Sequence, residues 1–224
     1  LQIYRFTRPF DLTVDQLETQ LEACAFTPCG SQDISRFGWV KPLGKFGATL
    51  THSSGLYLGA WTSSVDFGDD FKTRQELEYY AGYFWQASDA ISLDLGYIKY
   101  DYPKEAQFNL SEVYAILDLY GVKLGTYYSS DTPNVFGEDQ DTFYAYLGYT
   151  LALPAEFGLD LRVGRNDVKD EAFVSPNGDS RSTYYEWEAK LTRDFLGVNW
   201  GLSYIDTNLK KSECANWYGF DDLC

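Results

Sequence analysis

The sequence predicts an all-β protein: an antiparallel, up-and-down β-barrel of the membrane type with about nine or ten strands, preceded by a small α/β segment. Three observations predict this fold. Nine segments alternate apolar and polar residues with a period of two, which is typical of strands with one apolar face. The connections between them alternate between long and short, and aromatic residues, which favour strands, are abundant, with 19 Tyr, 15 Phe and 6 Trp.

The N-terminal segment, residues 1–53, predicts a strand, a helix and an irregular loop. Residues 2–7 alternate in polarity and indicate a short strand. Residues 13–25 predict a helix, because Thr13 and Gln16 have the spacing of a capping box. Apolar residues at helical spacing support the helix: Val14, Leu17 and Leu21.

The nine strands of the predicted barrel each approach the length that a tilted membrane-spanning strand needs. They cover residues 56–67, 76–86, 90–102, 112–120, 122–131, 142–151, 157–165, 184–195 and 198–206. An odd number of strands leaves open edges, which are prohibitive in lipid. Residues 45–52 could supply a tenth strand paired with 198–205; the alternative is that they are the end of a truncated domain. Phe46, Ala48 and Leu50 have the period that such a strand requires, and Tyr57, Gly59 and Trp61 continue that apolar face after the turn.

The predicted connections are sorted by length in the way that outer-membrane barrels sort theirs, with short turns at one end and long loops at the other. Long connections lie near 67–75, 103–110, 130–141, 167–181 and from 207 onward, and short ones near 87–89, 120–121, 153–156 and 195–197. Alternation alone allows a soluble barrel with its apolar face inside. Aromatic residues near strand ends favour the membrane type, as girdle residues: Trp61, Trp85, Tyr97 and Tyr149.

The charge of the chain is uneven. Residues 1–53 carry five basic and five acidic side chains, whereas residues 54–224 carry 13 basic and 28 acidic ones, which accounts for the net charge of −15. Such a region repels phosphate backbones, so we expect no nucleic-acid binding by the C-terminal part. No apolar run of about 18 residues predicts a membrane-spanning helix, and the N-terminus has no pattern of a signal peptide.

Charged residues on the polar face of the predicted strands are candidates for a water-filled lumen. They are Glu76, Glu78, Asp94, Glu112, Asp118, Asp160, Arg162, Glu186, Glu188 and Lys190. Because acids outnumber bases among them, a wet lumen is expected to prefer cations. In a small barrel the same charges could instead pair across strands and fill the interior.

No catalytic residues are expected. The single histidine, His52, has no serine and acid in a triad pattern around it, and the acidic pairs lack the twelve-residue calcium loop. Cys214 and Cys224, with nine residues between them, could form a disulfide in an oxidising compartment; a metal site and two free thiols are the alternatives. We expect no metal and no cofactor.

Two stretches of sequence resemble known families. "YRFTRPF", "FTPCGSQD", "GWV" and "TLTH" in residues 1–52 resemble the start of the recombination-associated protein family RdgC. That resemblance implies a cytoplasmic or nucleoid protein that binds duplex DNA without sequence preference as a ring-shaped dimer. It covers only the first part of such a protein, and this neutral segment cannot by itself make a continuous basic surface.

Residues 54–224 resemble the TorF-type porin family of Gram-negative bacteria, through "SSGLYLGAWTSSVDFGDD", "DLGYIKYDYP", "TFYAYLGYTLALP" and "CANWYGFDDLC". The resemblance implies an outer-membrane β-barrel whose partners are membrane lipid and small solutes or ions. The chain departs from the family pattern at both ends, because residues 1–53 replace the first two strands and no further strand with a terminal aromatic residue follows Cys224. A truncated barrel is therefore expected.

The sequence thus predicts two domains, 1–53 and 54–224, and leaves two functions open. The first is a porin-like barrel that passes small solutes, prefers cations mildly and is not an enzyme. The alternative is an RdgC-like DNA-binding protein of recombination or replication. A chimera with neither function intact is the third possibility, and the oligomeric state is left open.

Overall fold

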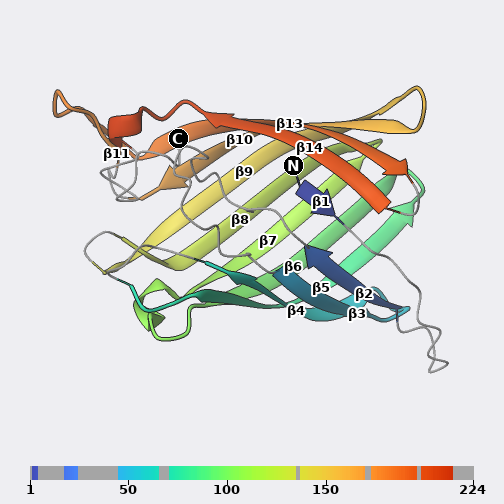
Figure 1. The fold of residues 1–224 in the computed structure, drawn as a ribbon, viewed down its shortest axis with the longest axis horizontal. Helices are drawn as coiled ribbons and strands as arrows, with labels where there is room; N and C mark the ends of the chain where they lie inside the picture. The colour runs from blue at the N-terminus through green and yellow to red at the C-terminus, as the bar shows by residue number, and fades with distance from the viewer. Residues whose placement is uncertain are drawn as a thin grey trace.

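The computed structural model describes residues 2–4, 18–24, 45–65, 71–134, 137–169, 173–195 and 198–213. Within these ranges the protein is almost entirely β-structure (Figure 1). The elements are β1 (Gln2–Tyr4), β2 (Glu18–Cys24), β3 (Lys45–Thr51), β4 (Leu56–Ser64), β5 (Gln75–Ser88), β6 (Ile91–Asp101), the 3-10 helix η1 (Ala106–Phe108), β7 (Leu110–Leu119), β8 (Val122–Pro133), β9 (Asp139–Leu153), β10 (Phe157–Val168), β11 (Phe173–Val174), β12 (Ser180–Arg181), β13 (Thr183–Phe195) and β14 (Val198–Thr207).

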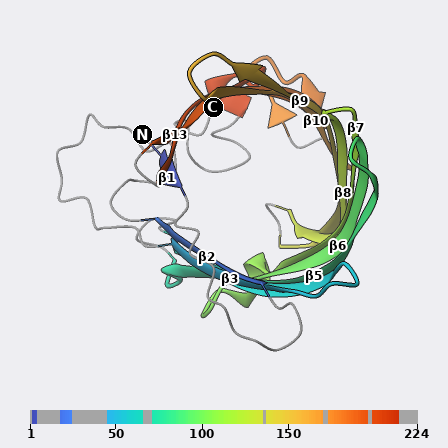
Figure 2. The same ribbon diagram turned by 90° about the vertical axis from the view of Figure 1, so that its right-hand side faces the viewer.

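Twelve of the strands form one antiparallel sheet, in the order β1-β14-β13-β10-β9-β8-β7-β6-β5-β4-β3-β2. Figure 2 shows the sheet end-on, curving round a central space so that its two edge strands, β1 and β2, lie on the same side. No ladder joins β1 to β2 in the described part of the chain. The all-β fold and the antiparallel up-and-down order are therefore confirmed, whereas a closed barrel is not shown.

All nine strands predicted between residues 56 and 206 are present, as β4–β10, β13 and β14. Their connections also alternate as predicted, because two- or three-residue turns such as 120–121 and 154–156 follow longer links. The link between β8 and β9 is shorter than expected, since both strands extend and leave only residues 134–138. The link from β10 to β13 carries the small hairpin β11–β12 (Figure 1, β11 at the left end).

The helix predicted over residues 13–25 is wrong, because residues 18–24 form strand β2. This strand pairs with β3 over its whole length, from Glu18 opposite Thr51 to Cys24 opposite Lys45. Without β2, the outer edge of β3 would present a row of unpaired backbone groups. The ladder satisfies these groups, and that gain outweighs the helical pattern of the segment, so residues 18–24 join the sheet as a strand instead of forming a helix.

The pairing predicted for residues 45–52 is also wrong. Strand β3 pairs with its sequence neighbour β4 across the turn 52–55, and β14 pairs with β1 instead. The turn is fixed by Gly55, whose φ of +93° suits glycine, and whose amide donates to the carbonyl of His52 at 2.9 Å. A short turn of this kind brings two strands together at little entropic cost, which the distant strand β14 cannot match.

The two faces of the sheet differ in chemistry. Large apolar side chains cover one face and are widely exposed, for example Leu58 at 57 % and Leu202 at 58 %. In contrast, Val168 and Phe173 are the only buried apolar residues of the described ranges, so the interior is not an apolar core. Among the described residues, no helix is long and apolar enough to span a membrane.

The two faces of strand β4 are exchanged relative to the prediction, so the odd-numbered residues point inward and the even-numbered residues point outward. Leu56 and Leu58 are exposed at 56 % and 57 % on the apolar outer face, while Tyr57 and Trp61 line the interior. The register explains this parity, because Leu50 of β3 lies opposite Leu58, and both belong to the outer face. Trp61 is therefore an interior residue and not part of an outer aromatic girdle.

Candidate functional site

The polar face of the sheet is its concave face. Hydrogen bonds on this face join Tyr57 of β4 with Asp94 of β6 and Tyr114 of β7, strands that are not neighbours, as the inner side of a curved sheet favours. The ladder registers place all ten predicted lumen residues on this face: Glu76, Glu78, Asp94, Glu112, Asp118, Asp160, Arg162, Glu186, Glu188 and Lys190. Their position is as the alternation predicts, while their role is not tested by it.

On strands β4–β8 three interior carboxylates, those of Glu76, Asp94 and Glu112, contact tyrosine hydroxyl groups; we call this part the acid–tyrosine wall. The Tyr57 hydroxyl donates to Asp94 Oδ1 at 2.7 Å and also contacts the Tyr114 hydroxyl. Nearer the long connections, Tyr100 donates to Glu112 Oε2 at 3.0 Å. Tyr102 donates to Glu76 Oε2 at 2.5 Å. The carboxylates of this wall are thus held by neutral donors that leave their negative charge in place.

A hollow of about 440 Å³ lies within the acid–tyrosine wall. Its lining combines aromatic rings, two carboxylates and two apolar side chains: Tyr57, Trp61, Glu78, Tyr80, Asp94, Ile98, Tyr114, Ile116 and Tyr127. The described lining residues include no lysine or arginine. A volume of this size suits a small solute.

Glycines on the same face create the room for these rings. A Cβ added at Gly96 would lie less than 3.0 Å from the Tyr114 ring, and one added at Gly82 would collide with Tyr57. Each tyrosine therefore crosses the backbone of a neighbouring strand at a position without a side chain, and packs against the sheet there. Tyr114 and Tyr127 also stack on each other, with ring centroids 5.3 Å apart.

On strands β9–β13 interior charges form an ion pair across strands; we call this part the ion-paired wall. Arg162 lies between two carboxylates, with Nη2 at 3.4 Å from Glu186 Oε1 and 3.1 Å from Glu188 Oε2. Its guanidinium carbon also lies 5.7 Å from the centroid of the Tyr146 ring. The expectation that interior charges pair across strands is thus met here for three of the ten candidate residues.

Two further candidates, Asp118 and Asp160, make local hydrogen bonds. Asp118 accepts a hydrogen bond from the Gly121 amide at 2.9 Å and closes the turn between β7 and β8. Asp160 accepts one from the Thr150 hydroxyl at 2.6 Å. His52 contacts Ser54 through Nδ1 at 2.9 Å, within the same turn, which is a local contact without the third member of a triad.

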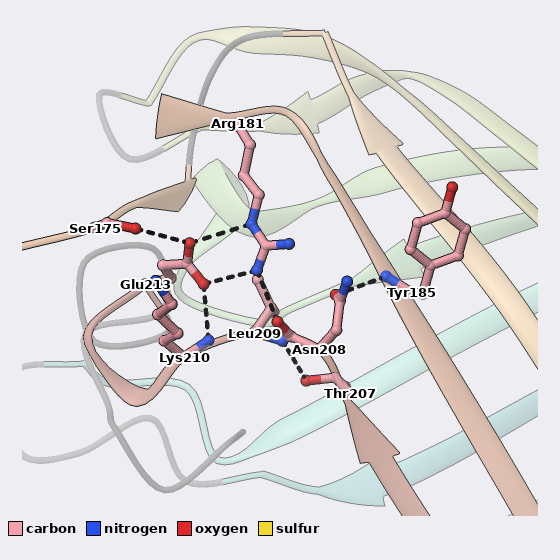
Figure 3. Close-up of polar contacts among 8 residues, drawn as sticks. All are labelled: Ser175, Arg181, Tyr185, Thr207, Asn208, Leu209, Lys210 and Glu213. Atoms are coloured by element: carbon pink, nitrogen blue, oxygen red, sulfur yellow. Dashed lines mark hydrogen bonds and ion pairs between the residues drawn. The ribbon is translucent and has the colours of Figure 1, made fainter. Parts of the chain in front are cut away.

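A charged cluster at the loop end, which the sequence analysis missed, joins the β11–β12 hairpin to the residues after β14 (Figure 3). Arg181 donates to both carboxylate oxygens of Glu213, from Nε at 3.1 Å and from Nη2 at 2.7 Å. The Ser175 hydroxyl and the Lys210 amide donate to the same carboxylate. No sequence motif signals this pair, because its members lie 32 residues apart in long connections.

Burial on its own would raise the pKa of the Glu213 carboxyl, since its side chain is only 4 % exposed. The hydrogen bonds from Arg181, the Lys210 amide and Ser175 act in the opposite direction and together lower that pKa below its ordinary value. Glu213 is therefore ionised at neutral pH and holds the hairpin through a bidentate ion pair.

Metal binding finds no support within the described ranges, where no group of three or more His, Cys, Asp and Glu side chains is arranged to hold an ion. The acidic pairs Asp69–Asp70 and Asp221–Asp222 lie outside the described residues. So do Cys214 and Cys224, and their disulfide stays a prediction.

Comparison with known proteins places most of the chain in one family. The profile of the family described as "Bacterial protein of unknown function (Gcw_chp)" matches residues 41–223, which contain strands β3 to β14. The chain belongs to the Gcw_chp family. The predicted membership of the TorF-type porin family is not shown, since Gcw_chp is a different family.

The N-terminal segment matches a second family, described as "Putative exonuclease, RdgC", over residues 1–62. The recombination-associated protein RdgC of Aeromonas hydrophila is 93 % identical over 58 residues, which are 26 % of this chain and 19 % of that protein. The proteins of the same name from Psychromonas ingrahamii and Tolumonas auensis are 58 % identical over 58 residues and 54 % identical over 54 residues, which are 26 % and 24 % of this chain and 19 % and 18 % of those proteins.

The chain thus spans about a fifth of the length of the curated relatives it matches. The predicted RdgC resemblance of the N-terminal segment is confirmed. The matches to RdgC and Gcw_chp overlap in residues 41–62, which contain β3, the turn 52–55 and most of β4. The predicted boundary at residue 53 stays a prediction.

Proposed function

We propose that this Gcw_chp-family chain forms a curved β-sheet in the outer membrane of a Gram-negative bacterium, with its apolar face against lipid. The observation that supports this proposal most is that large apolar side chains lie exposed on the convex face, while the polar side chains lie on the concave face. Leu95, Val163 and Leu202 are 44 %, 48 % and 58 % exposed on the convex side. An apolar surface that covers a whole sheet is far larger than soluble monomers expose, and lipid is the environment that suits it.

The polar concave face then lines a path for small solutes. Interior acids outnumber interior bases, and only Arg162 and Lys190 among the ten candidates are cationic, so the path prefers cations mildly. In this proposal the chain is a porin-like protein without catalysis, and closure of the sheet between β1 and β2 completes the barrel.

Planar bilayers containing the purified, folded chain test this function. Conductance steps with a reversal potential that shifts toward the cation equilibrium in a salt gradient are expected. Cell fractionation adds the location, because the chain should sediment with outer membranes. A folded and inserted protein that gives no conductance, or one that prefers anions, would overturn the proposal.

A second candidate function rests on the N-terminal match. The 93 % identity to a recombination-associated protein favours an RdgC-like DNA-binding protein of the cytoplasm or nucleoid. The neutral charge of residues 1–53 and the strongly acidic remainder oppose it, because binding to phosphate needs a basic surface. A gel shift with duplex DNA at low salt is the most permissive test. No shift there excludes this candidate, and absence of both activities leaves a chimera of two family segments.

A further inference from the structure

We infer that Arg193, on the convex face near the short turns, binds the phosphate group of a membrane phospholipid. This inference rests on the proposed function, in which the convex face contacts lipid, and deepens it by naming a lipid ligand and its site. Three observations carry it: the position of Arg193 on the sheet, the aromatic rings beside its guanidinium, and the pairing of a second convex arginine, Arg165.

Arg193 lies near the end of β13, just before the short turn to β14. Its neighbours on the same side of β13 are Leu191 and Phe195, which are 38 % and 51 % exposed on the convex face. Its ladder partners are Phe157 of β10 and Trp200 of β14. Since ladder partners and residues two apart point to the same face, Arg193 belongs to the convex face. In outer-membrane barrels the short turns lie on the periplasmic side, so Arg193 would lie near the lipid headgroups there.

Two aromatic rings lie beside the guanidinium of Arg193. Its central carbon is 4.8 Å from the centroid of the Phe157 ring and 5.5 Å from that of the Phe195 ring. Such cation–π contacts attract the charge but provide no acceptor in the plane of its N–H donors. The Nε atom is buried and has no hydrogen-bond partner within the described ranges. Arg193 is therefore a cation within an aromatic surface that faces lipid in the proposed function, and such a cation is costly unless an anion pairs with it.

The second convex arginine shows how the chain itself can pair such a charge. Arg165, nearer the long connections on β10, has Nη2 2.8 Å from Asp167 Oδ2, two residues along the same strand. For Arg193, the described residues include no carboxylate that forms an ion pair with it. A phospholipid would supply the anion at this level, together with acyl chains that cover the neighbouring rings. Arginine suits this ligand, because its planar fork donates two parallel N–H···O bonds to a phosphate.

Native mass spectrometry of the full chain, refolded in a polyoxyethylene detergent, measures lipid binding directly. Dioleoylphosphatidylglycerol is compared with dioleoylglycerol, which has the same acyl chains and no phosphate. The phospholipid is expected to bind about fivefold more tightly, since a basic side chain near a membrane surface contributes about 1 kcal/mol. Equal binding of the two lipids would overturn the inference.

A soluble headgroup separates a lipid site from a site for free phosphate. sn-Glycerol 3-phosphate, added at the same concentration as the phospholipid, should not displace it, because the soluble compound lacks the acyl chains that contact the apolar face. Displacement at that concentration would assign the site to a free phosphate and overturn the lipid ligand.

Matched variants locate the site. Arg193→Gln should remove the preference for the phospholipid, and Arg193→Lys, which keeps the charge but not the planar fork, should lower it. Arg165→Gln removes the same charge from the pair with Asp167 and should leave the preference unchanged. Circular dichroism checks that each variant is folded, and Arg193→Lys decides if Arg193→Gln does not fold. A preference that is unchanged in the Arg193 variants, or that falls equally in Arg165→Gln, would overturn the assignment.

Lipid binding in detergent does not depend on conductance, so the two proposals fail separately. A chain that conducts cations but does not distinguish the two lipids refutes the Arg193 site and leaves the proposed function intact. A chain that prefers the phospholipid through Arg193 but gives no conductance supports the site and refutes solute passage.

Discussion

The two walls of the interior contain the same kinds of side chain in different combinations. On the acid–tyrosine wall, Asp94 and Glu112 accept hydrogen bonds from tyrosine hydroxyls, and no arginine stands between them. On the ion-paired wall, Arg162 lies between Glu186 and Glu188. Hydroxyl donors hold a carboxylate in position but keep its charge, whereas a guanidinium cancels that charge. Arg162 therefore reduces the negative charge of the ion-paired wall, whereas Asp94 and Glu112 keep theirs.

The largest effect is expected from a pair of substitutions that test whether the convex faces of both walls contact lipid. Leu95→Arg on β6 and Val163→Arg on β10 place a charge on the convex face of each wall. If both faces contact lipid, each change should destabilise the folded chain by about 2–4 kcal/mol, measured by denaturant unfolding in lipid vesicles. Ala106→Arg, on the exposed helix η1, is the control and should cost little. Small and equal effects at all three positions would show that the convex face contacts water.

A second pair of changes tests the packing of the tyrosines. Gly96→Ala is expected to destabilise the acid–tyrosine wall by about 1–3 kcal/mol, because the new methyl group would collide with the Tyr114 ring. Gly148→Ala on β9 is the matched change in the other wall, where the nearest atoms lie at 3.5 Å, an ordinary contact. It should be nearly neutral, and a larger loss at Gly148 than at Gly96 would contradict the packing described.

The loop end of the ion-paired wall depends on Glu213. Glu213→Gln should weaken the attachment of the β11–β12 hairpin by about 1–2 kcal/mol, measured by amide hydrogen exchange at Val174 and Arg181. Because the pKa of Glu213 is lowered in the folded protein, its contribution is complete above the ordinary pKa of 4.5. The contribution is lost as the pH falls below 4.5 and through the folded-state value.

Once exchange rates are corrected for their intrinsic dependence on pH, weaker protection of the hairpin in acid is therefore expected in the natural chain and absent in Glu213→Gln. Ser130→Ala, at an exposed serine of β8, serves as the control. Protection of the hairpin that falls equally in acid in both proteins would show that another group controls it.

The smallest expected effect on stability concerns the balance of the ion-paired wall. Arg162→Met leaves Glu186 and Glu188 without their shared cation and should cost about 1 kcal/mol, since the arginine side chain is 36 % exposed. Its effect on selectivity should be clearer, because the ion-paired wall would become more negative and the reversal potential should move further toward cations. Arg165→Met, which removes the same charge from the pair with Asp167, is the control. Equal shifts from both variants would contradict a role for the interior position.

Periodicity was sufficient to predict the nine strands, the sorting of their connections and the face of all ten interior charges. These features depend on the alternation of apolar and polar residues along one strand, which is visible in the sequence itself. The prediction of which face of β4 points outward was wrong, because Tyr57 and Trp61 are amphipathic. Such a residue suits an inner lining of tyrosines as well as an outer apolar face. Leu56 and Leu58, which contain no polar atom, were the better guide.

The N-terminal segment and the partners across strands were less predictable. Residues 18–24 have helical spacing, but their structure is decided by the free edge of β3, which the local sequence does not contain. In the same way, nothing near Arg162 indicates that Glu186 and Glu188 lie beside it, because register and strand order bring them there. The ion pair of Arg181 and Glu213 could not be predicted for the same reason, because its members come from two long connections.

The ladder between β1 and β14 has a consequence for folding. The other ladders of the large sheet join strands that follow each other along the chain, except that β10 pairs with β13 because the β11–β12 hairpin lies between them in the sequence. They can therefore form one after another as the chain emerges, each closing a short loop. The pairing of Gln2 with Gly201 needs both ends of the chain at once. This ladder is consequently expected to form last, and until then strand β14 keeps an edge that is open to other chains.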